Sequence, residues 1–147
     1  MRSVRYHSVC WATALLCGCT PLPTKNTTPS ITSVSHNVTV TTKAGQTKTI
    51  AVDVPTDVCS APDYISGFRS QYIYTWNVEL GAKETSASAN VRQRLDAMRL
   101  SPITVAPIPS QTETPQQAAC GALALAKGQT AGGNRAHNDL LAEPLGQ

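Results

Sequence analysis

Residues 37–42 and 48–54 are rich in β-branched side chains and alternate apolar with polar positions. Because successive side chains of a strand point to opposite faces, this alternation predicts two strands that each bury one face. The connecting residues include Gly45 and have the length of a hairpin loop, and Pro55 ends the second strand. We therefore predict a β-hairpin. It must pack on another element, because two strands alone are barely stable.

Between residues 60 and 80 the apolar positions recur at intervals of three and four, which is the spacing of one helical face. These positions are Ile65, Phe68, Tyr72, Trp76 and Leu80. Ser60 and Asp63 have the spacing of a capping box, and Pro62 falls in the first turn, where its missing N–H costs little. Gly81 is suited to end this helix as its C-cap.

A strand is the alternative for residues 71–80, where aromatic and branched side chains alternate strictly with other residues. The capping residues and the longer apolar stripe favour the helix. We interpret the rings as part of the core, because they lie at packing spacing. A ligand or partner surface formed by Tyr72, Tyr74 and Trp76 is the alternative interpretation.

Two more helices are predicted further along the chain. One runs from Thr85 or Ser88 to Leu100, and its apolar face has helical spacing. That face consists of Val91, Leu95 and Met98. Residues 102–109 contain several prolines, so they are expected to cross the surface in extended form, with an edge strand as one option.

The other helix covers residues 115–127, with Thr114 as its N-cap, Gln117 completing a capping box and Gly128 ending it. Residues 129–147 are rich in turn-forming residues and are expected to form a flexible tail. The patterns together predict a small α+β fold, in which an N-terminal β-hairpin packs with about three helices in a globular domain over residues 36–128.

Composition and charge fit one small domain and disfavour nucleic acid as a partner. The chain has 147 residues, of which 41% are hydrophobic and 14% charged, and its formal net charge is +3. Two of the positive charges belong to Arg2 and Arg5, close to the N-terminus. The other Lys and Arg residues are scattered and form no basic stripe interleaved with aromatic residues. We therefore expect no nucleic-acid partner.

The N-terminal residues have the parts of an export signal: a basic start, an apolar run over residues 9–16 and a small residue before a cysteine. The apolar run is about half of the roughly 20 residues that a membrane-spanning helix needs. It ends in Leu16-Cys17-Gly18-Cys19, which resembles the lipobox of bacterial lipoproteins. Cys17 departs from the usual Ala or Ser of that motif, but it is small enough to fit.

The resemblance implies that residues 1–18 are a signal peptide and that Cys19 begins the mature protein. In this family the thiol takes a diacylglyceryl group and the freed amine takes another acyl chain, such as palmitate. Several chains anchor the protein firmly, since each buried CH₂ contributes about 0.8 kcal/mol. Thr20, rather than Asp, follows the cysteine, which by resemblance favours the outer membrane facing the periplasm. Residues 19–35, rich in Pro, Ser and Thr, are then a flexible tether.

The cysteines that remain after processing are Cys59 and Cys120. An even pair in an oxidising compartment predicts a disulfide between them. A zinc site needs more clustered Cys and His residues, and a redox-active dithiol needs Cys-x-x-Cys spacing, and the sequence has neither.

The sequence has no Gly-x-Ser-x-Gly, His-Glu-x-x-His or phosphate-binding motif. We therefore expect no catalytic residues, no metal site, no cofactor besides the covalent lipid on Cys19, and no enzymatic activity. The first hypothesis is a membrane-anchored envelope lipoprotein that binds a protein partner, as a component or modulator of an envelope, secretion or conjugation assembly. The alternative is a small periplasmic ligand-binding lipoprotein or hydrolase that uses an aromatic cleft at Tyr72, Tyr74 and Trp76.

Overall fold

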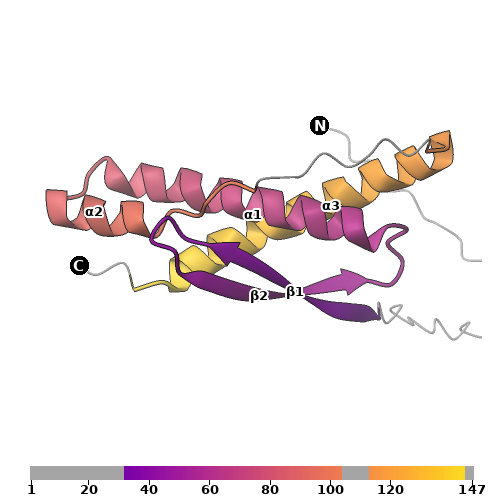
Figure 1. The fold of residues 1–147 in the computed structure, drawn as a ribbon, viewed down its shortest axis with the longest axis horizontal. Coiled ribbons are helices and arrows are strands. Elements are labelled where there is room, and N and C mark those ends of the chain that lie inside the picture. The colour runs from indigo at the N-terminus through magenta and orange to yellow at the C-terminus, as the bar shows by residue number, and fades with distance from the viewer. Residues whose placement is uncertain (1–31, 104–112, 145–147) are drawn as a thin grey trace, which may run out of the picture. The chain divides into compact units, whose positions relative to one another are not determined.

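The computed structural model describes residues 32–103 and 113–144, and these form a small α+β fold (Figure 1). The elements follow the order β1 (Ser33–Thr41), β2 (Thr47–Pro55), α1 (Ala61–Glu84), α2 (Ala89–Ala97) and α3 (Pro115–Ala142). The hairpin β1–β2 lies along one side of the two long helices, and α2 folds back beside the end of α1 (Figure 1). The predicted fold class, a hairpin with three helices and one disulfide, is confirmed.

The hairpin is antiparallel, with Val38 opposite Ile50 and Thr41 opposite Thr47. Gly45 has φ +82° in the turn, a conformation that side chains disfavour. The inward positions are buried as the alternation predicts: Val38, Val40, Ile50, Val52 and Val54. β1 begins at Ser33, so the end of the predicted tether (19–35) is instead a strand. The reason is that its residues pair with the end of β2, which satisfies their backbone groups although their side chains are polar.

Helix α1 settles the ambiguity over residues 71–80, which are helical throughout. Ser60 is the N-cap, and its side chain accepts a hydrogen bond from the Asp63 N–H at 3.5 Å. The predicted stop at Gly81 is wrong, because the helix continues to Glu84. The extra turn is held by Arg99, whose guanidinium binds the carboxylate of Glu84.

Helix α3 runs past Gly128 to Ala142, so both the predicted stop and the predicted tail over 129–142 are wrong. Gly128 lies inside the helix, where a Cβ atom would come 2.0 Å from the Tyr64 carbonyl oxygen of α1. At Gly132, a Cβ atom would come 2.2 Å from the Phe68 carbonyl oxygen. These glycines allow the backbones of two parallel helices to touch, rather than ending a helix.

The core lies between the hairpin and the helices. On α1, the rings of Phe68, Tyr72 and Trp76 stack in series, with centroids 6.0 and 5.9 Å apart. Cys59 and Cys120 form the predicted disulfide, with their Cα atoms 5.9 Å apart, and it joins the segment before α1 to the N-terminal part of α3. Helix α2 is shorter than predicted. Of the segment 102–109, only residues 102–103 are described, and they form no strand.

Candidate functional site: a groove along α1

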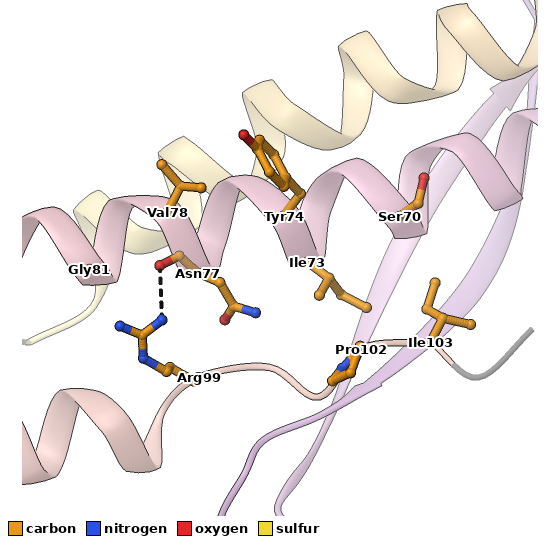
Figure 2. Close-up of a pocket in the computed structure, with 9 residues that line it drawn as sticks. All are labelled: Ser70, Ile73, Tyr74, Asn77, Val78, Gly81, Arg99, Pro102 and Ile103. Atoms are coloured by element: carbon orange, nitrogen blue, oxygen red, sulfur yellow. Dashed lines mark hydrogen bonds between the residues drawn. The ribbon is translucent and has the colours of Figure 1, made fainter.

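The side of α1 that faces away from α3 carries a groove made of two adjoining hollows, which we call the α1 groove. The first hollow has a volume of about 660 Å³, within the usual range of binding sites (Figure 2). It is lined by Ser70, Ile73, Tyr74, Asn77, Val78, Gly81, Arg99, Pro102 and Ile103. The second has a volume of about 600 Å³ and shares Ser70 and Ile103 with the first. Its other lining residues are His36, Ala61, Pro62, Ile65, Ser66 and Arg69.

One wall of the α1 groove is the segment 99–103, which side-chain and backbone hydrogen bonds hold in place. The Asn77 amide donates to the Leu100 carbonyl at 2.9 Å and accepts from the Leu100 N–H at 2.8 Å. On the other side of the segment, the Ser101 N–H donates to the Thr41 carbonyl at 2.8 Å. In Figure 2, Ile73 and Asn77 point from α1 toward this segment. The wall is therefore fixed both to α1 and to the end of β1.

Two large apolar side chains of α1 stand exposed along the first hollow. Tyr74 is 63% exposed and Val78 is 52% exposed, and they lie four residues apart on one helical face. Four residues is about one helical turn, so the two side chains are neighbours. Exposed apolar side chains beside a hollow are typical of binding surfaces.

Two arginines line the groove, and their surroundings differ. Arg99 donates to both carboxylate oxygens of Glu84, at 3.2 and 2.8 Å, and its Nη1 lies 3.5 Å from the Asn77 carbonyl oxygen (Figure 2). The hydrogen bonds to Glu84 raise the pKa of Arg99, and its charge is balanced by that carboxylate. Arg69 is half-buried, and its Nε–H is buried without a hydrogen-bond partner among the described residues. No carboxylate is found among the described residues that line either hollow.

The predicted surface of Tyr72, Tyr74 and Trp76 does not form. The helix directs Tyr72 and Trp76 into the core, where they are 0% and 3% exposed, and directs Tyr74 into the groove. A strand would have put all three on one face, but a helix places positions 72 and 76 together and position 74 nearly opposite. Tyr72 and Trp76 border a smaller cavity of about 160 Å³ beside Lys48 and Glu143.

The surroundings of this smaller cavity are those of a structural site. The Tyr72 hydroxyl donates to Asp139 at 2.8 Å, and burial, with this hydrogen bond, raises the pKa of Tyr72. Lys48 lies 4.8 Å from the centre of the Trp76 ring and pairs with Glu143 at 3.1 Å. These contacts join β2, α1 and α3 around the stacked rings.

Of the other predicted site residues, Cys59 and Cys120 are joined as expected, while Cys19 and residues 1–18 lie outside the described part of the chain. Within residues 32–103 and 113–144, no three His, Cys, Asp or Glu side chains gather as metal ligands would. In the same ranges, no helix combines the length and the apolar character needed to cross a bilayer.

The sequence-based interpretation missed the groove residues Arg69, Asn77 and Arg99. A partial signal exists in the four-residue spacing of Tyr74 and Val78, which marks a second apolar face on the same helix. No local sequence pattern marks Arg69 as a groove residue, because the tertiary fold determines which side chains surround it. Comparison of the chain with protein-family models, curated proteins and solved structures gives no match.

Proposed function

We propose that this chain is an envelope lipoprotein, anchored through lipid on Cys19 in the outer membrane and facing the periplasm, that binds a protein partner through the α1 groove. The anchoring part rests on the lipobox-like Leu16-Cys17-Gly18-Cys19 and the apolar run before it. The Cys59–Cys120 disulfide fits the oxidising compartment that this route implies.

One observation carries the binding role: Tyr74 and Val78 are exposed along the first hollow of the α1 groove, and the adjoining second hollow is lined by Arg69, whose Nε–H has no hydrogen-bond partner among the described residues. Aromatic and arginine side chains are enriched at the energetic centres of protein interfaces. The alternative of a small ligand bound at Tyr72, Tyr74 and Trp76 has less support, because the three rings form no common cleft and the cavity at Tyr72 and Trp76 is smaller than typical ligand sites.

Anchoring is tested by fractionating cells that express the full chain or its Cys19→Ser variant. The full chain should remain with the outer membrane, and the variant should lose its membrane attachment, because the oxygen of serine cannot take the place of the thiol in lipid transfer. Membrane attachment that survives the substitution would contradict the lipid anchor.

Partner binding is tested by placing the photo-crosslinker p-benzoylphenylalanine at position 74 of the full chain in its own envelope. The matched control carries the crosslinker at position 141, because Leu141 is 65% exposed and is absent from the lining of the groove. A discrete crosslinked product from Tyr74, absent from Leu141 and lost in Val78→Asp, is expected. Equal crosslinking from both positions would contradict a role for the groove.

A further inference from the structure

In the described part of the chain, the outer edge of β1 carries backbone groups without hydrogen-bond partners next to the α1 groove. The Thr42 N–H points toward β2 and donates to Gln46, whereas the Thr41 carbonyl points away from β2 and accepts from Ser101. Backbone direction alternates along a strand, so residues 35, 37 and 39 also point away from β2. Among the described residues, strand pairing on this edge stops at Ser101.

β1 borders the groove. His36 of β1 lines the second hollow, and Ile103, two residues after the edge-bound Ser101, lines both hollows. An incoming segment could therefore pair with β1 while its side chains reach the groove. An extended peptide has the backbone donors and acceptors that such an edge needs, and adding a strand to a sheet edge is a common mode of peptide recognition.

Arg69 adds a requirement for charge. Arg69 lines the second hollow, its buried Nε–H has no partner among the described residues, and no carboxylate is present among the described lining residues. The positive charge of Arg69 therefore has no acidic side chain beside it in this lining, and a carboxylate can accept two parallel hydrogen bonds from one guanidinium. The groove is thus complementary to an anionic side chain.

From these observations we propose that the α1 groove binds an extended segment of the partner protein, which adds to the outer edge of β1 and places an Asp or Glu carboxylate on Arg69. Apolar side chains of the segment pack on Ile65, Ile73 and Ile103, which line the floor and wall. The inference specifies the partner chemistry of the proposed function and rests on that function for its biological meaning.

The test uses the purified full chain in detergent and fluorescein-labelled peptides that alternate Thr and Val around one central Glu. Fluorescence anisotropy measures the dissociation constant. Replacing the central Glu by Gln should weaken binding about tenfold, the effect of losing one charge-assisted hydrogen-bonded pair. Methylating alternate backbone nitrogens should abolish binding, because it removes the donors that pair with β1.

Two pairs of protein variants locate the contact. Asn37→Pro removes an outward N–H that the hairpin does not use, whereas Asn37→Ala keeps it, so only the first should weaken binding. The Arg69→Gln variant should bind the peptide with central Glu and the peptide with central Gln equally well. The Arg94→Gln variant, changed at an exposed position of α2, should still prefer the peptide with central Glu. An unchanged melting temperature shows that each variant is folded, and Arg69→Lys, which keeps the charge, should retain part of the preference.

The inference would be overturned by the lack of saturable binding up to about 1 mM peptide, by equal affinity for the Glu and Gln peptides, or by full binding in Asn37→Pro. Free acetate competing as well as the peptide would indicate simple anion binding and would also overturn it. Crosslinking from Tyr74 in the envelope, if it persists in any of these cases, leaves the proposed function standing. Loss of the crosslinked product from position 74 would instead overturn the proposed function.

Discussion

Replacing Gly128 by Ala tests the close contact between α1 and α3. Alanine favours a helix over glycine by about 1 kcal/mol, so local preference alone predicts a more stable protein. The new Cβ atom would lie 2.0 Å from the Tyr64 carbonyl oxygen and 3.0 Å from the Phe68 nitrogen. Both obstacles are backbone atoms of α1, so no side chain can rotate away, and the helices must separate by about 1 Å to reach even the shortest tolerated contact.

Overpacking of this kind typically costs about 1–3 kcal/mol, and an immovable obstacle puts Gly128→Ala at the upper end. After the gain in helix preference, the free energy of unfolding should fall by about 2 kcal/mol, a large share of a small domain's stability. Urea unfolding followed by far-ultraviolet circular dichroism, with the disulfide intact, measures this difference.

Gly133→Ala is the matched control, because its Cβ atom would lie 3.4 Å from the flexible Gln71 side chain. That variant should be unchanged or up to about 1 kcal/mol more stable. If Gly128→Ala were as stable as Gly133→Ala, the two helices could not be in backbone contact at Gly128, and the account of why α3 continues past this residue would fail.

The remaining predictions concern the disulfide and the buried tyrosine. Replacing Cys59 and Cys120 together by Ser removes a cross-link with a sequence separation of 61. The greater chain entropy of the unfolded state should lower the free energy of unfolding by about 4 kcal/mol and lower the melting temperature sharply. An unchanged melting temperature would refute a stabilising role for the disulfide. Tyr72→Phe removes the hydrogen bond to Asp139 and should cost about 1 kcal/mol in urea unfolding at neutral pH. The folded state raises the pKa of Tyr72 above its ordinary value of 10.0. The contribution of the protonated Tyr72 hydroxyl to the free energy of unfolding is therefore complete below pH 10.0 and is lost as the pH rises further. The fall in stability at alkaline pH should therefore be shallower in Tyr72→Phe, and identical slopes would contradict the burial of the phenol.

The sequence was informative where periodicity determines which side chains are buried. The alternation in 37–42 and 48–54 identified the inward residues of the hairpin, and the stripe from Phe68 to Leu80 identified the buried face of α1. The disulfide was predicted from the two cysteines that remain after the expected processing, and the structure contains it. Each of these predictions depended on local spacing or on a count.

The sequence was misleading where the partner of a residue determines its role. Glycine ends helices and also permits close helix contacts, and only the position of α1 shows that Gly128 has the second role. The α1 groove likewise depends on where the fold places the segment 99–103 against α1 through Asn77. The described lining of the second hollow places no acidic side chain beside Arg69, and no local pattern in the sequence encodes this.

The most direct measurement of the central claim is the intact mass of the protein recovered from the membrane fraction of cells that express the full chain. A chain that begins at Cys19 and carries the mass of a diacylglyceryl group with one further acyl chain is predicted. A chain that still begins at Met1, or one cleaved without any lipid mass, would contradict the proposal that this protein is a lipid-anchored envelope lipoprotein.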